Sequence, residues 1–337
     1  MVVAILLASA VLLISRAKNQ PTPTDHLASI NDEELSSAEY EQIKQELLAL
    51  SASTTPKVAL ASLRSRTATH NGLLKLCHPV VHELGRAAYE QYGDFGKAMT
   101  YQDELCNSGY LHGIIEAHFS KSTDILETIQ SVCAHYPDGS YIAWECYHGV
   151  GHGVMYATQN DLPQSLALCE GYATAFSRNS CINGVFMENF NTDEKLHPSI
   201  YLDAADPFYP CASQAPLHRA DCYVYAPTYY LSIHKNSYTE ALAWCSEAPL
   251  SYRAPCAQGV GSQTMKENIN NPKFAESVCA NDIYGRTDEC IMGMVSLFIN
   301  HHGSIEPARH LCIQLEPSRK QACETAIKRS QHLFIES

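Results

Sequence analysis

Histidines are the residues in this sequence whose type and spacing favour chemistry. They occur in three segments that each follow a cysteine: CHPVVHELG, CNSGYLHGIIEAHF and CYHGVGHG. Residues four apart share one face of a helix. The segments therefore predict a group of side chains on one helical surface: His78, His82, His112, Glu116, His148 and His152.

A set of imidazoles with a carboxylate is typical of sites for zinc, copper or iron. His112 and His152 each lie six residues after a cysteine, and His82 lies five after one. Such positions line up on one surface if the segments are repeats. We therefore predict a divalent transition metal held by this group. In an enzyme, Glu116 or His148 would be the catalytic residue that handles the proton while the ion activates water or an oxidant.

The alternative interpretation is that these histidines are structural and bind backbone or tyrosine groups. No HExxH motif is present, and a bis-histidine haem is a weaker option because there is no CxxCH motif. Recurrence in three successive segments favours the metal site, since later segments carry other residues at the matching positions: Met187, Thr228, Ser262 and Ser296. Glu188 could add an acidic group. Histidines without a counterpart are weaker candidates: His118, His135, His301 and His302.

The cysteines predict the scaffold that positions this group. There are 14, and from Cys133 onward they form close pairs: Cys133 with Cys146, Cys169 with Cys181, Cys211 with Cys222, Cys245 with Cys256, Cys279 with Cys290, and Cys312 with Cys323. We expect each pair to be a disulfide, because zinc sites favour a CxxC spacing that the chain lacks. By parity, Cys77 should bridge to Cys106.

The interval between successive second cysteines is mostly close to 34 residues, which is the size of a helix-turn-helix repeat. Stretches such as NPKFAESVC predict a short helix that runs into the first cysteine, and CIMGMVSLFINHH predicts a longer helix after the second. A glycine recurs three residues after the cysteine, which indicates close approach of a neighbouring helix. We predict an all-α fold: an α/α solenoid of about seven helix-hairpin repeats, stapled by disulfides.

Helical hairpins of this size, each with a cysteine pair and a CxxG element, resemble the Sel1-like repeats of secreted cysteine-rich proteins, which are related in design to TPR repeats. The resemblance covers roughly residues 70–335. It implies a binding role, and no motif carries a site residue over from that family.

The N-terminus predicts export. Residues 1–17 contain an apolar run that suits a signal peptide or a membrane anchor, and 18–37 look like a polar linker. Arg16 and Lys18 after the run would place the body in the cytoplasm, but the cysteine pairs favour an oxidising compartment. We expect an extracytoplasmic, periplasmic or secreted protein. Capping helices are predicted at 38–70 and repeats at 71–337, of which 71–192 are rich in histidine and 193–337 are later repeats.

Charge and repeat architecture suggest the partners. A net charge of -13 disfavours nucleic acid, whose phosphates attract clustered Lys and Arg. Solenoids present a concave surface to other molecules. We therefore predict a scaffold that binds a protein or peptide in its groove, contacts membrane only through the N-terminal segment, and holds a metal in its first three repeats. The alternative is a metal-dependent enzyme, either a hydrolase or an oxidoreductase, that uses the same residues.

Overall fold

The computed structural model describes residues 35–103, 105–122, 125–191 and 198–334, and all regular structure in these ranges is helical. Two helices precede the repeats, α2 (Ser37–Ser53) and α3 (Pro56–Thr67). The long helices are α4 (Asn71–Tyr92), α6 (Leu105–Lys121), α8 (Tyr141–Ala157), α10 (Ala175–Phe190), α11 (Arg219–Ile233), α13 (Arg253–Glu267), α15 (Thr287–His302) and α17 (Lys320–Ser330). The short helices are α5 (Phe95–Met99), α7 (Ile125–Val132), α9 (Leu162–Glu170), α12 (Tyr238–Cys245), α14 (Pro272–Ala280) and α16 (Glu306–Gln314).

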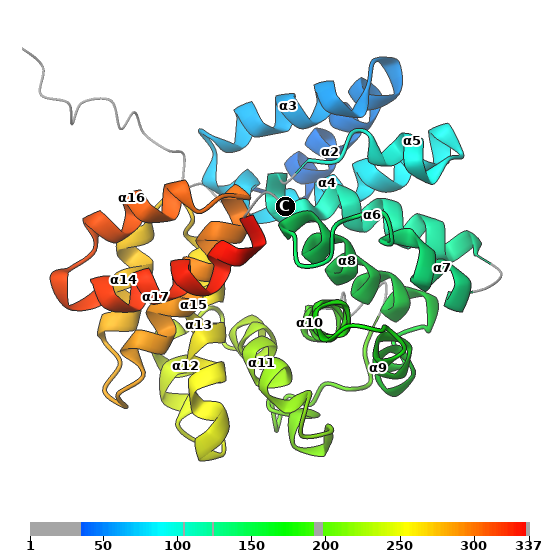
Figure 1. Ribbon diagram of the computed structural model, residues 1–337. Coiled ribbons are helices and arrows are strands. Elements are labelled where there is room, and N and C mark those ends of the chain that lie inside the picture. Colours follow the sequence, from blue (N-terminus) through cyan, green and yellow to red (C-terminus); the bar gives the residue numbers. More distant parts are fainter. Residues whose placement is uncertain (1–34, 104, 123–124, 192–197, 335–337) are drawn as a thin grey trace, which may run out of the picture.

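From α4 onward the long and short helices alternate along the chain, except between the long helices α10 and α11, and they form two curved layers (Figure 1). Successive long helices are neighbours on the inner side, and the short helices cover them from outside. Apolar side chains between the layers form one continuous core. The predicted all-α repeat solenoid is therefore confirmed.

Local sequence explains where the short helices begin. The N-cap Asp161 accepts a hydrogen bond from the Gln164 backbone N–H at 3.0 Å, and Asn271 caps α14 in the same way. Proline occupies the first turn of α9, α14 and α16, where a missing N–H is tolerated. Between α10 and α11, the described residues 198–218 hold only the 3₁₀ turn η2 (Cys211–Ser213). This irregular segment accounts for the longer interval at that repeat.

All seven predicted disulfides are present. Six of them close loops with a sequence separation of 11 to 13 residues and tie a short helix or loop to the next long helix. Cys77–Cys106 instead joins α4 to α6, across a separation of 29 residues. A bridge that closes a dozen residues stabilises a fold by about 3 kcal/mol through the entropy of the unfolded chain. The bridges thus hold each hairpin against the next.

Glycine lets the long helices approach at backbone distance. A Cβ on Gly184 would overlap the carbonyl oxygen of His148 and lie 2.9 Å from its carbonyl carbon. Gly113 and Gly259 have the same relation to the carbonyls of His82 and Val224. The predicted close approach is confirmed, and it continues through the early and the late repeats.

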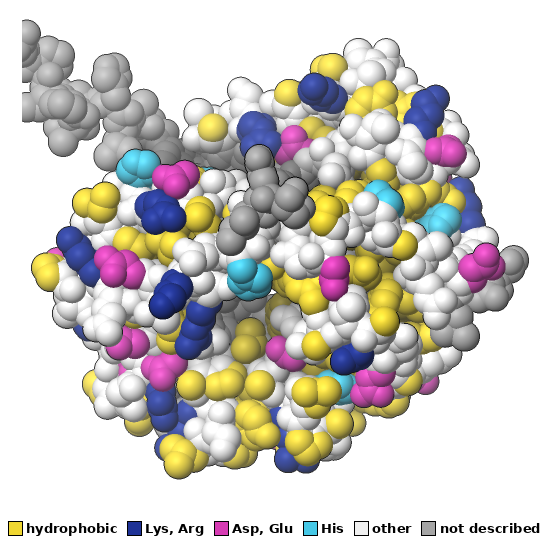
Figure 2. Space-filling model, in the orientation of Figure 1, with side chains coloured by type: hydrophobic (Ala, Val, Ile, Leu, Met, Phe, Trp, Pro, Cys, Tyr) yellow, Lys and Arg dark blue, Asp and Glu magenta, His cyan; other side chains and the backbone are white. Residues whose placement is uncertain are grey.

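The last repeats contact the first ones. The Tyr141 hydroxyl on α8 donates to the carbonyl oxygen of Asn300 on α15 at 2.8 Å, and its ring stacks on Phe334 with centroids 4.7 Å apart. A pocket of about 440 Å³ lies where the last repeats meet the first, and we call it the seam pocket. Its lining includes Arg64, Asp103 and His301. The face in Figure 2 is hollowed near its middle and carries interspersed acidic and basic side chains.

The N-terminal predictions fall largely outside the described residues. Residues 1–34, which include the predicted signal peptide or anchor and most of the predicted linker, are not described. Helices α2 and α3 lie in or next to the range 38–70, and their role as caps stays a prediction. Among the described helices, none combines the length and the apolar character needed to cross a membrane.

Because the helices approach closely at glycine, we expect a side chain at such a position to lower the stability of the protein. We expect Gly259→Ala to lower the free energy of unfolding by about 1–3 kcal/mol or more, because the new Cβ overlaps the Val224 carbonyl of the neighbouring helix. Urea unfolding of the oxidised protein, followed by circular dichroism, measures it. Gly96→Ala is the control, since the nearest atom to its Cβ is Asp94 Oδ1 at 3.5 Å. Equal stability of the two variants would contradict the close approach.

Candidate metal centre

Three neighbouring long helices bring the predicted residues together. His78 and His82 lie on α4, His112 and Glu116 on α6, and His148 and His152 on α8. We call the five histidines the histidine core: His78, His82, His112, His148 and His152. Their ring centroids lie 4.5 to 6.2 Å apart in the closest pairs. All six predicted ligands therefore occupy one small region of the inner layer.

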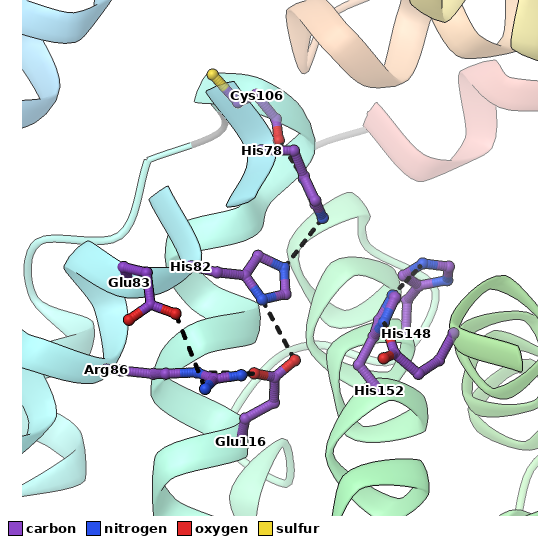
Figure 3. Close-up of polar contacts among 9 residues, drawn as sticks. His78, His82, Glu83, Arg86, Cys106, Glu116, His148 and His152 are labelled. Carbon is purple, nitrogen blue, oxygen red and sulfur yellow. Dashed lines mark hydrogen bonds and ion pairs between the residues drawn. The ribbon is translucent and has the colours of Figure 1, made fainter. Parts of the chain in front are cut away.

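The first pair, His78 and His82, presents two ring nitrogens to each other (Figure 3). His78 Nδ1 lies 2.6 Å from the Cys106 carbonyl oxygen. Because a carbonyl only accepts, His78 Nδ1 carries the proton and donates. His82 Nδ1 lies 3.3 Å from Glu116 Oε1, and its Nε2 lies 3.0 Å from His78 Nε2.

Glu116 is an anion that is fully engaged. Burial alone would raise its pKa, but His82 and Arg86 outweigh that effect, and the pKa is lowered to about 2. Arg86 donates to Glu116 Oε2 from Nε at 3.1 Å and also from Nη2 (Figure 3). A carboxylate in this state only accepts, so His82 Nδ1 carries a proton and donates to it.

The second pair, His148 and His152, repeats this arrangement on α8. Glu188 Oε2 of α10 lies 2.7 Å from His152 Nδ1, as Glu116 lies beside His82. His152 Nε2 and His148 Nε2 are 3.2 Å apart. The sulfur of Met187 lies 3.3 Å from His148 Nε2. Within each of the two pairs, the two Nε2 atoms thus face each other.

His112 lies between the two pairs. Its centroid is 5.6 Å from that of His78 and 4.6 Å from that of His152. The side chain is 1 % exposed, and neither ring nitrogen has a hydrogen-bond partner among the described residues. His148 Nδ1 is likewise buried without a partner there. Orphaned polar atoms in an interior are costly, so they indicate a ligand.

Three sets of side chains have ligand atoms within 4.8 Å of one another: His78, His82 and His112; His112, His148 and His152; and Glu116, His152 and Glu188. Two imidazoles on a tetrahedral ion with bonds of about 2.0–2.1 Å are about 3.3 Å apart, which is close to the spacing inside each pair. The donor set therefore fits a transition metal.

Two residues of this region were not predicted as part of the site. Met187 occupies a repeat position at which the earlier repeats have histidine, and the pattern of histidines does not mark Arg86. Both side chains contact the core or its carboxylate. Met187 and Glu188 reach the core because α10 approaches α8 at Gly184, one of the glycines that recur three residues after a cysteine.

The remaining histidines have other surroundings. His118 Nδ1 lies 2.9 Å from the Tyr89 hydroxyl, a contact that holds its ring against α4. His135 packs on Tyr136 with centroids 4.0 Å apart. His301 and His302 line the seam pocket, and His301 also lines a cavity of about 20 Å³ that His78 and Lys266 share. None of the four belongs to the three metal-ligating sets among the described residues.

Comparisons with protein-family models, with curated proteins and with solved structures found no match. What the structure supports is the design, helical hairpins with seven disulfides. Assignment to Sel1-like or TPR-like repeats stays a prediction. The arguments about function therefore rest on the site itself.

The buried imidazoles predict acid sensitivity of the metal-free protein. Burial lowers the pKa of His78, His112 and His148 well below 6.5. Below pH 6.5 the unfolded chain binds protons that the folded chain does not, so stability falls as the pH decreases from about 6.5. The slope is about 1.4 kcal/mol per pH unit for each histidine.

Urea unfolding in chelator between pH 7.5 and pH 5 measures this slope. His112→Leu should reduce it, because one of the neutral imidazoles is gone. His310→Ala, at an exposed position, is the control and should leave the slope unchanged. An identical pH dependence for His112→Leu and the unmodified chain would contradict the assignment of a buried neutral imidazole.

Proposed function

We propose that this protein is an extracytoplasmic repeat protein that binds a transition-metal ion in its histidine core. The observation that carries the proposal is the first pair. His78 and His82 each donate from Nδ1 to an oxygen, and their Nε2 atoms face each other at 3.0 Å. Two facing lone pairs repel unless a proton or a metal ion lies between them.

At neutral pH the Nε2 atom of His78 carries no proton. Burial, together with the neighbouring His82 and Lys266, lowers the pKa of His78. A metal ion between the two Nε2 atoms accepts a lone pair from each, and Glu116, which is paired with Arg86, lies beside His82. Zinc, copper and iron all bind neutral imidazole.

The surrounding contacts are those of a preorganised metal site. Glu116 and Glu188 fix the orientation of His82 and His152, as carboxylates do behind metal-ligating histidines. Arg86 in turn holds Glu116, and it stacks over Tyr156 with its guanidinium 5.3 Å from the ring centroid. The cost of ordering these side chains is met during folding, before the ion arrives.

Location follows from the disulfides. Seven bridges and no free cysteine point to an oxidising, extracytoplasmic compartment. Anchoring by the N-terminal segment is part of the proposal and concerns residues that are not described.

The chemistry of Glu116 and His148 favours holding a ligand over transferring protons. Glu116 has both oxygens engaged and a pKa of about 2, far from the range of a general acid or base at neutral pH. Burial keeps His148 neutral by lowering its pKa. The metal-dependent hydrolase or oxidoreductase of the sequence analysis therefore stays an alternative prediction, as do the catalytic roles of these two residues.

Metal content tests the proposal. We expect the full-length oxidised protein, equilibrated separately with zinc, copper and iron and then desalted, to retain about one ion per chain or more by mass spectrometry. The variant with His82, His112 and His152 changed to alanine should retain none, with unchanged helicity by circular dichroism.

The matched control changes three exposed histidines, His135, His310 and His332, to alanine. It should bind as the unmodified chain does. No uptake of any of the three metals by the unmodified chain, or equal uptake by both triple variants, would refute the proposal.

Partner binding by the scaffold is a second candidate function. The observation that favours it is a row of exposed apolar side chains in three consecutive loops between short and long helices. Leu217, Leu250 and Ile283 are 68 %, 71 % and 85 % exposed and are spaced 33 residues apart. Equivalent positions of a solenoid lie along one edge, so these side chains form a strip suited to a protein or peptide.

Crosslinking tests this candidate. A photoreactive residue at position 250, in the cell that exports the protein, should give one discrete crosslinked product. The same residue at the exposed position 235 should give none. Identical products from both positions would remove support for a docking strip.

A further inference from the structure

Met187 places a soft donor beside one half of the histidine core. Its sulfur lies 3.3 Å from His148 Nε2, and that nitrogen lies 3.2 Å from His152 Nε2. His148 Nε2 is therefore in contact with two further donor atoms, the Met187 sulfur and His152 Nε2. Met187 is partly buried, and it stands next to Glu188 on the first turn of α10 beyond Gly184.

We infer that His148, His152 and Met187 form a copper(I) site, separate from the ion held by His78 and His82. The inference rests on the proposed function and specifies the ion for the second pair. Thioether sulfur is a ligand of soft ions and selects Cu(I), whereas Zn²⁺ in proteins is bound by imidazole, thiolate and carboxylate.

A hydrogen bond from His148 to Met187 does not account for the geometry. His152 donates from Nδ1 to Glu188, and its Nε2 faces His148 Nε2. One proton on His148 Nε2 can point at this nitrogen or at the sulfur, but not at both. A soft cation bound by all three atoms satisfies each of them.

The atoms that surround the two histidine pairs differ in their chemical hardness as metal ligands. Each pair has a carboxylate beside it, Glu116 for the first and Glu188 for the second, and the first pair also contacts the Cys106 carbonyl. The second pair has the Met187 sulfur in direct contact. His82 and His152 are 6.2 Å apart between ring centroids, with His112 beside both, so the pairs are adjacent but distinct.

Close helix approach builds the copper(I) site. A Cβ at Gly184 would overlap the His148 carbonyl, so only glycine lets α10 come near enough for Met187 to reach His148. The disulfide Cys169–Cys181 ties the start of this part of α10 to α9. The sulfur is therefore held in place by the scaffold.

Met187→Leu tests the inference, because leucine keeps the volume and removes the sulfur. We expect the full-length variant to bind Cu(I) about tenfold more weakly or worse in competition with a Cu(I) chelator, with zinc affinity unchanged within about twofold. X-ray absorption of the Cu(I)-loaded unmodified chain should show a sulfur neighbour that is absent in the variant. Met265→Leu, at a buried position of α13, is the control and should change neither.

The outcomes separate this inference from the proposed function. If the unmodified chain binds zinc and Cu(I) but Met187→Leu leaves Cu(I) affinity and the copper spectrum unchanged, the copper(I) site is refuted while metal binding stands. If the unmodified chain binds neither ion, both fail. Loss of zinc and Cu(I) together in Met187→Leu, with helicity intact, would also refute a separate site.

Discussion

Backbone-to-backbone approach of neighbouring long helices is the constraint on which the rest of this structure depends. At Gly113 and Gly184 a side chain of any size would overlap the carbonyl of His82 or His148 on the preceding helix. This spacing brings residues on one helix within bonding reach of residues on the next. The disulfides hold each hairpin in that position, at a stabilisation of about 3 kcal/mol for each short loop.

The same approach determines the chemistry of the core. Imidazoles that face each other across closely spaced helices are removed from water, so burial lowers the pKa of His78, His112 and His148 and leaves them neutral. Neutral imidazole is the form that binds metals. Glu116 stays charged in the same surroundings because His82 and Arg86 outweigh its burial. Burial and charge together produce donors that point inward and carboxylates that orient them.

The scaffold encloses the core more than a simple open solenoid would. The contact of Tyr141 with Asn300 and Phe334 brings the last repeats against the first. Lys266, from α13, and His78, from α4, consequently line one cavity although they are far apart in the sequence. The histidine core is thus covered by repeats that contribute none of the three candidate ligand sets found in the described residues.

The sequence by itself determined the repeat fold, the disulfide pairs and the six residues of the candidate site. These follow from local periodicity: cysteine spacing, glycine after cysteine, and histidines that recur at matching positions. Only the tertiary structure decided that Glu188 faces His152, that Met187 reaches His148, and that the chain closes on itself at Tyr141. These contacts depend on the angle and separation between helices, which arise from the sum of many interhelical contacts and leave no local pattern in the chain.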